Sequence, residues 1–286
     1  MAGGALKAIL SLAALSSTTI VGSAQPARIA SMNVCTDQLL LALVPPERIA
    51  SLSYLSADPR TSAVAEEVGP FRRNRGVAEE IVALAPDLIV TGNFGFRPTV
   101  MVLRQLGYAV VELPMAERLA DVAANLRILG AAVGEPERAA ELISAFEADV
   151  ARLTRRNRPE APLFAKYDVN GWSTGQNSLV ADIVHRAGFQ MPADRLGHGE
   201  ARRLSLEQLL LLRPAVIDFG TPWNDPPALA SETFHHPALS TLLQSTRLIQ
   251  IPEPLWICGT LRSIEALALL RNERDALMRN GRDSER

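Results

Sequence analysis

The chain has 286 residues, of which 48% are hydrophobic and 21% are charged. This is enough apolar material for two α/β lobes or one large domain that folds without disulfide support. The formal net charge of −2 provides no global positive field, so the composition argues against nucleic acid and anionic membranes as partners.

Residues 1–24 have the pattern of a secretory signal peptide. Lys7 gives a positive start, an apolar run covers residues 8–21, and the small residues Gly22 and Ala24 stand before a cleavage point at Gln25. No later run approaches the ~20 apolar residues that a membrane span requires. We therefore expect an exported protein whose mature chain begins near Gln25.

Residues 25–117 alternate short apolar runs with helical patterns. In order, the segments are RIASM, TDQLLLALV, RIASLS, EEIVALA, DLIVTG, VMVLRQLG and AVVEL. Strand-like runs separated by helices of this size predict βαβ units and a mainly parallel sheet. We expect this region to form one Rossmann-like α/β lobe.

Residues 118–157 change character, because apolar positions recur at helical spacing with almost no strand signal. The run Gly134-Glu135-Pro136 interrupts the pattern, which predicts two helices over about 118–133 and 136–156. The second is long enough to span ~30 Å at 1.5 Å per residue. This region is expected to be a helical linker containing one long, rigid helix between lobes.

Residues 158–286 resume the α/β alternation and are expected to form a second lobe. Residues 79–90 align with residues 207–218, and each copy starts with Glu, passes through a Pro-containing turn and ends in a buried strand. The predicted fold class is therefore α/β, with two Rossmann-like lobes that have central parallel sheets and are joined by one long helix. Such an arrangement leaves a ligand cleft between the lobes.

These repeated segments resemble the periplasmic binding proteins of iron-siderophore, haem and cobalamin ABC importers, whose two lobes are joined by one rigid helix. The resemblance runs from RIASMN through two E-x-I/L-x-x-L-x-P segments and TGQNSLVADIVHRAGF to PLWICGTLRSIEAL. It implies a periplasmic protein that delivers a ligand to a membrane permease, and it does not name the ligand. We expect a monomer that captures a metal chelate, either a ferric siderophore or a corrinoid. The resemblance implies no intrinsic cofactor, no resident metal and no catalytic site.

The resemblance also assigns a role to one acidic residue on each lobe. In this family an acidic side chain near the start of the helix before the Pro turn docks onto arginines of the permease, and here those positions are Glu79 and Glu207. Two carboxylates held far apart on rigid lobes would set orientation and encounter rate. The alternative is that each carboxylate only stabilises its own helix, because a negative charge in the first turn interacts favourably with the helix dipole.

Arginines stand just upstream of both glutamates. Arg72, Arg73 and Arg75 precede Glu79, and a second group precedes Glu207, namely Arg202 and Arg203. Guanidinium groups on both sides of a cleft can grip carboxylate or catecholate oxygens through bidentate hydrogen bonds. The alternative is ordinary solvated charge on surface loops.

Aromatic residues in the predicted cleft loops are candidates for flat apolar walls against a corrin ring or an aromatic chelator, and packing of the loops is the alternative. They are Tyr54, Phe94, Phe96, Trp172 and Trp256. Trp256 is favoured, since the family often places an aromatic residue there.

Haem is the alternative ligand of the same fold. Haem-binding relatives usually offer a tyrosine in the loop before the first glutamate, and here that loop reads FRRNR, without an iron ligand. On the opposite lobe, His198 can supply one.

The mature chain keeps two cysteines, Cys35 and Cys258, both predicted in loops that face the cleft. An even pair in an oxidising compartment indicates a disulfide. The competing hypothesis is a pair of free thiols presented to a soft metal or a thiol-reactive ligand.

An enzyme is the main alternative outside transport. Asp37, Asp168, Asp182, Asp218 and Asp225 invite a search for paired carboxylates, but the chain contains no HExxH, GxSxG, Walker A or GxGxxG pattern. We therefore predict that the protein is not an enzyme. A ligand sensor or an enzyme that uses the same cleft remains the alternative class.

Overall fold

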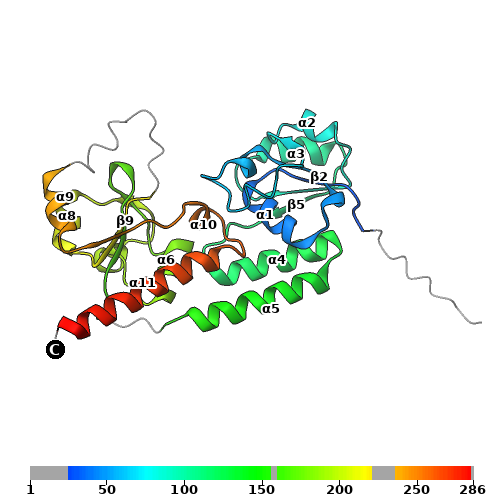
Figure 1. Cartoon of the computed structure of the whole chain (residues 1–286). Coiled ribbons are helices and arrows are strands. Elements are labelled where there is room, and N and C mark those ends of the chain that lie inside the picture. Colours follow the sequence, from blue (N-terminus) through cyan, green and yellow to red (C-terminus); the bar gives the residue numbers. More distant parts are fainter. Residues whose placement is uncertain (1–24, 156–159, 221–235, 285–286) are drawn as a thin grey trace, which may run out of the picture.

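The computed structural model describes residues 25–155, 160–220 and 236–284. The predicted signal peptide, residues 1–24, lies outside the described residues, and so does the predicted cleft loop that starts at residue 221. Two α/β lobes lie side by side, and the helices α4, α5 and α11 run beneath and between them (Figure 1). This is the predicted fold class.

The N-terminal lobe contains one five-stranded sheet in the order β3-β2-β1-β4-β5, with every neighbouring pair parallel. Its elements are β1 (Ile29–Ser31), α1 (Val34–Leu43), β2 (Ile49–Ser53), β3 (Arg73–Asn74), α2 (Ala78–Val82), β4 (Leu88–Gly92), α3 (Arg97–Gln105) and β5 (Val110–Leu113). Two 3-10 turns, η1 (Pro46–Arg48) and η2 (Tyr54–Ala57), flank β2. The central strands β1 and β4 are fully buried, as expected for a parallel sheet covered on both faces.

Two helices follow the first lobe. They are α4 (Leu119–Val133) and α5 (Pro136–Leu153), close to the predicted bounds. Between them Gly134 adopts φ +75°, a left-handed conformation that glycine reaches without steric cost, and Pro136 starts the next helix. The long helix α5 then leads to the second lobe.

The C-terminal lobe has a smaller parallel sheet in the order β10-β9-β6 and a separate two-stranded antiparallel ribbon, β7 with β8. Its elements are β6 (Phe164–Lys166), η3 (Val169–Gly171), β7 (Trp172–Ser173), α6 (Leu179–Ala187), α7 (Pro192–Leu196), β8 (Arg202–Arg203), α8 (Leu206–Leu212), β9 (Val216–Asp218), α9 (Pro237–Leu243) and β10 (Arg247–Ile249). The ribbon is an addition to the predicted parallel plan.

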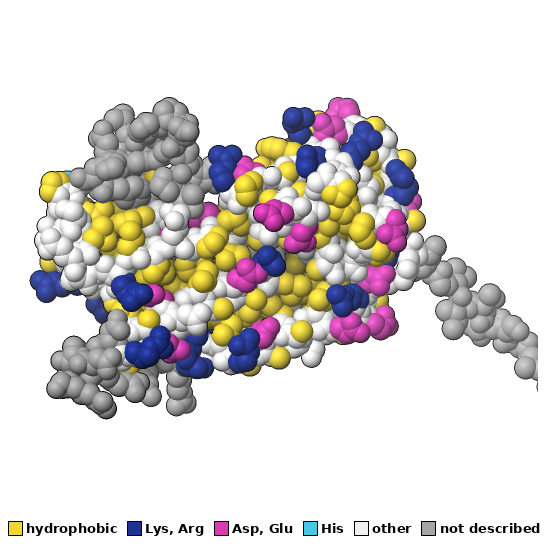
Figure 2. All heavy atoms as spheres, viewed as in Figure 1, with side chains coloured by type: hydrophobic (Ala, Val, Ile, Leu, Met, Phe, Trp, Pro, Cys, Tyr) yellow, Lys and Arg dark blue, Asp and Glu magenta, His cyan; other side chains and the backbone are white. Residues whose placement is uncertain are grey.

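After β10 the chain returns to the junction of the two lobes. We call residues 250–262 the crossover segment; it contains the short helix α10 (Pro254–Ile257) and leads into α11 (Ser263–Ser284). Helix α11 packs against α6 and α5. On the face drawn in Figure 2, hydrophobic side chains gather over the helices beneath the lobes, while charged side chains are interspersed along the upper edge of the N-terminal lobe.

None of the helices described here combines the length and apolar character needed to cross a membrane.

Candidate functional site

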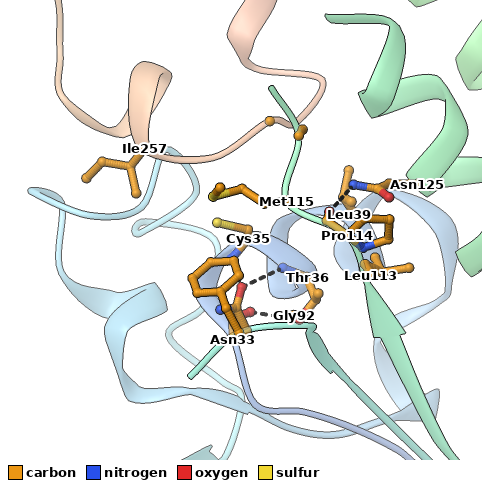
Figure 3. Close-up of a pocket in the computed structure, with 13 residues that line it drawn as sticks. Asn33, Cys35, Thr36, Leu39, Gly92, Leu113, Pro114, Met115, Asn125 and Ile257 are labelled. Carbon is orange, nitrogen blue, oxygen red and sulfur yellow. Dashed lines mark hydrogen bonds between the residues drawn. The ribbon is translucent and has the colours of Figure 1, made fainter. Parts of the chain in front are cut away.

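A cavity lies where β1 and β4 end, between the N-terminal lobe and the crossover segment (Figure 3). In the sheet order β1 and β4 are neighbours. From β1 the chain continues outward through β2 and β3 on one side, and from β4 it continues to β5 on the other. Ligands of open parallel sheets usually bind at such a point. Asn33 and Gly92 come from the strand ends, and Ile257 comes from the crossover segment. The cavity measures about 60 Å³, which holds only a few waters. A larger ligand would therefore bind above it, between the rims of the lobes.

A disulfide forms part of this cavity wall. Cys35, in the first turn of α1, is bonded to Cys258, which ends α10, and their Cα atoms are 5.1 Å apart. Asn33 caps α1 by accepting a hydrogen bond from the Cys35 backbone N–H at 2.9 Å, which fixes the direction in which the sulfur leaves the helix. The bond attaches the crossover segment to the N-terminal lobe, and neither sulfur is a free thiol in this structure.

The rim of the N-terminal lobe is basic and aromatic. Arg72, Arg73 and Arg75 are all exposed on the short stretch around β3. The guanidinium of Arg75 lies 5.9 Å from the centre of the Tyr54 ring, within cation–π range. Phe94 is 48% exposed beside the cavity. These five side chains are therefore exposed on the same lobe and available to a ligand, with Arg75 and Tyr54 in direct contact.

Phe96 does not belong to that surface. It is partly buried against the core of the N-terminal lobe, and its ring lies over Gly76 so closely that a Cβ there would be 2.4 Å from Cε1. Its predicted role as a cleft wall does not fit this position, because the ring is used in packing.

The rim of the C-terminal lobe is built by the β7–β8 ribbon. Trp172 stands opposite Arg203, and Ser173 stands opposite Arg202. Residues facing each other across such a pair have Cβ atoms ~5 Å apart, so an exposed indole and an exposed guanidinium are neighbours here. The two lobes thus each carry an aromatic side chain beside an arginine.

His198 lies in the loop between α7 and β8, partly buried, with Nδ1 3.2 Å from the carbonyl oxygen of Glu200. The ribbon and this loop are linked, because the Gln176 backbone N–H donates to the His198 carbonyl at 3.3 Å. Among the side chains that the structure describes, no group of three or more His, Cys, Asp or Glu is placed to hold a metal ion.

Trp256, the favoured aromatic candidate, occupies a different environment from the one predicted. It is 4% exposed and its ring packs 6.4 Å from that of Phe164 in the main core. The short helix α10 turns Trp256 inward and its neighbour Ile257 toward the cavity. Ile257 and Met115 are two apolar cavity residues that the sequence does not single out, because nothing in their local sequence distinguishes them from surface residues.

Behind the N-terminal rim lies a buried carboxylate, Asp37. Its Oδ2 accepts hydrogen bonds from the Ser53 backbone N–H at 3.0 Å and from the Ser56 hydroxyl. Burial raises the pKa of Asp37 to about 7, although the bonds from Ser31, Ser56 and Ser53 oppose the shift. Because Ser53 and Ser56 flank Tyr54, Asp37 fixes the turn that presents Tyr54 to the cleft.

The corresponding strand ends of the C-terminal lobe carry an ionic cluster. Lys166 ends β6 and its Nζ donates to Asp168 Oδ1 at 2.9 Å and to Glu253 Oε2 at 3.1 Å. Asp218, its register partner on β9, is fully buried. We call Lys166, Asp168, Asp218 and Glu253 the lysine cluster. Its signal in the sequence is that Lys166 is the only lysine besides Lys7, in a chain with 27 arginines.

Glu79 and Glu207 occupy matching positions in the first turns of α2 and α8, and both are exposed. The backbone at the start of α8 and the Ser205 hydroxyl lower the pKa of Glu207. Both carboxylates therefore point into solvent from the helix that follows the basic rim of each lobe.

Comparison with protein families decides the classification. The family model described as periplasmic binding protein matches residues 29–241, most of the chain. The chain belongs to the periplasmic binding protein family. A comparison with curated protein sequences finds no match.

Solved structures of this family share the fold. The haem-binding protein of Roseiflexus sp. RS-1 has a TM-score of 0.70 and 22% identity, covering 86% of this chain and 97% of its own. The vitamin B12-binding protein of Vibrio cholerae has a TM-score of 0.65 and 18% identity, covering 88% and 98%. An ABC transporter substrate-binding protein of Listeria monocytogenes has a TM-score of 0.66 and 16% identity, covering 86% and 97%.

Proposed function

We propose that the protein is the substrate-binding component of an ABC importer, and that it captures a ferric siderophore or a corrinoid between its lobes. The observation that carries this proposal is the matched pair of rims, each with exposed arginines beside an aromatic ring. Guanidinium groups bind anionic oxygens in a bidentate manner, and aromatic faces cover a flat ligand. The family and the relatives named as vitamin B12-binding and ABC transporter proteins support the same role.

Delivery to a membrane permease follows from this role. Glu79 and Glu207 are the proposed docking residues, one on each lobe, because both are exposed carboxylates on matching short helices. The proposed location is the periplasm, reached through the signal peptide at residues 1–24. The protein acts as a monomer that binds and releases its ligand unchanged, so it is not an enzyme.

Haem is a second candidate ligand, favoured by one observation. A tyrosine can hold haem iron, and Tyr54 is 50% exposed on the N-terminal rim with Arg75 over its ring. A relative described as haem-binding shares the fold. Haem ranks second because the FRRNR loop has no iron ligand.

A ligand panel tests the proposal. Thermal shift and titration calorimetry would compare ferric enterobactin, an anionic catecholate, with cyanocobalamin, cobinamide and haemin. We expect stabilisation by a ferric chelate or a corrinoid. Stabilisation by haemin alone, with a Soret band that Tyr54→Phe abolishes, would establish haem instead. No binding of any of these compounds, together with turnover of another substrate, would contradict the transport role.

A further inference from the structure

The lysine cluster contains more negative than positive charge. One ammonium, that of Lys166, faces Asp168, Glu253 and Asp218. The side chain of Lys166 is 3% exposed, so water contributes little to balancing these charges. Placing three carboxylates around one buried ammonium is costly unless a further positive charge joins them.

The carboxylate of Asp218 is the part of the cluster whose negative charge is least balanced. Its Oδ1 accepts a hydrogen bond from the Gly220 backbone N–H at 2.9 Å, whereas its Oδ2 is buried and has no hydrogen-bond partner among the described residues. Burial raises the pKa of Asp218 to about 6, Lys166 and the Gly220 N–H oppose the shift, and Glu253 and Asp168 add to it. A buried carboxylate oxygen without a partner is unusual and needs an explanation.

Two carboxylates of the cluster reach solvent. The side chains of Asp168 and Glu253 are 32% and 19% exposed. Lys166 bonds to only one oxygen of each, so Asp168 Oδ2 and Glu253 Oε1 accept no hydrogen bond from the part of the chain described here. Two carboxylate oxygens are thus available at the carboxyl ends of β6 and β9, the edge of a parallel sheet at which ligands bind.

The surroundings favour an organic cation. The Asp168 backbone N–H donates to the Trp172 carbonyl at 2.8 Å, so the backbone of Trp172, whose indole is exposed, lies close to that of Asp168. Aromatic faces attract ammonium groups. A metal ion is not indicated, because Lys166 already lies between the carboxylates and no group of three His, Cys, Asp or Glu side chains in the described residues is placed to hold a metal.

Gly220 keeps the space beside these oxygens open. Its φ is +65°, and a Cβ on it would lie 2.4 Å from Asp168 Oδ1 and 3.4 Å from Lys166 Nζ. A side chain at this position would push Asp168 away from Lys166. The geometry therefore requires both the left-handed backbone and the missing side chain of glycine here.

We propose that the lysine cluster is a subsite for a positively charged group of the ligand, an alkylammonium in particular. The ammonium lies between Asp168 Oδ2 and Glu253 Oε1, with the indole of Trp172 beside it and Asp218 behind. Lys166 is a positioning residue that orients both carboxylates. This subsite rests on the proposed function, and it narrows the ligand to a chelate that offers anionic oxygens to the rims and a cationic group to the C-terminal lobe.

The test uses two chelates that differ only in this group. Ferrioxamine B has a free terminal ammonium, and its N-acetyl derivative is neutral there. We expect the ammonium form to bind about tenfold more tightly, the size of a charge-assisted hydrogen bond. Asp168→Asn and Glu253→Gln should each remove most of this preference, measured as the ratio of the affinities for the two chelates. The matched control is Glu141→Gln, on the exposed face of α5.

A second measurement needs no chelate. In the full chain carrying Lys7→Arg, Lys166 is the single lysine, so selective lysine labelling gives one side-chain NMR signal. Titration with n-butylammonium should shift it saturably, n-butanol should not, and Asp168→Asn should abolish the response. Equal affinity for the two chelates, or an absent butylammonium response, overturns the subsite. A butylammonium response without binding of either chelate supports the subsite and counts against the proposed siderophore function.

Discussion

The two lobes follow one plan but hold their strand ends with different chemistry. In the N-terminal lobe a single buried carboxylate, Asp37, is surrounded by uncharged serine groups. In the C-terminal lobe Lys166 holds three carboxylates, two of which reach solvent. The first arrangement uses its polar groups to fix a loop. The second leaves carboxylate oxygens available, so the strand ends of the C-terminal lobe are the ones that can attract a cationic group.

The largest expected effect on stability comes from the disulfide between Cys35 and Cys258, which joins the N-terminal lobe to the crossover segment. The disulfide closes a loop of sequence separation 223, and removing a cross-link over so long a loop costs about 5 kcal/mol of unfolding free energy. Cys35→Ser with Cys258→Ser should show this loss in urea unfolding, and wild type in reductant should match it. Equal stability of the oxidised and reduced forms would show that the crossover segment holds its place without the bond.

The next effect contrasts the two polar centres directly. Lys166→Met leaves three carboxylates without their ammonium and should cost about 3 kcal/mol. Asp37→Asn replaces a carboxylate with a neutral group of the same shape and should cost about 1 kcal/mol. Chemical unfolding of both variants at pH 7 tests the ranking. A reversed order would mean that Lys166 is not the counterion on which the C-terminal lobe depends.

The pH dependence separates the lobes further. Burial raises the pKa of Asp37 to about 7 and that of Asp218 to about 6, from the usual 3.8 of an aspartate carboxyl group. The folded protein therefore binds more protons than the unfolded chain above pH 3.8, so these groups make the unfolding free energy fall as the pH rises. The fall in unfolding free energy caused by Asp218 should be complete once the pH passes about 6, and the fall caused by Asp37 once it passes about 7.

Two variants assign these slopes. Unfolding free energies measured from pH 4 to pH 8 should become flatter in Asp37→Asn up to about pH 7, and in Asp218→Asn only up to about pH 6. The groups facing Asp218 are Lys166, Asp168 and Glu253, whereas those bonded to Asp37 are uncharged. Unchanged slopes in both variants would contradict the raised pKa values.

The smallest effect on stability is expected at the docking residues. Glu79→Gln and Glu207→Gln change exposed carboxylates and should alter the unfolding free energy by less than about 0.5 kcal/mol. Ligand affinity should also stay the same, while permease-dependent uptake should fall. The control is Glu141→Gln, and normal uptake by the double variant would rule out the docking role.

Much of the fold could be predicted because its signals are local. The paired Glu-to-Pro segments and the Gly134 to Pro136 break specify helices and strands by short-range rules. The bounds of α4 and α5 agree with the predictions to within three residues. The β7–β8 ribbon has no such signal, because two-residue strands are defined only by the partner that they meet.

The site was less predictable because it depends on the direction of side chains. Trp256 and Ile257 are neighbours in sequence, yet one enters the core and the other faces the cavity. The partners of Lys166 come from three separate segments, so only the folded chain brings them together. The rarity of lysine was visible in the sequence, but its surroundings were not.

One measurement tests most directly the claim that both lobes grip one ligand. Calorimetry would compare ferric enterobactin and cyanocobalamin in two variants, the triple change of Arg72, Arg73 and Arg75 to Ala and the double change of Arg202 and Arg203 to Ala. We expect each variant to bind the anionic chelate about tenfold or more weakly and to keep its affinity for the neutral corrinoid almost unchanged. Unchanged affinity for the chelate in either variant would contradict a grip that spans the cleft.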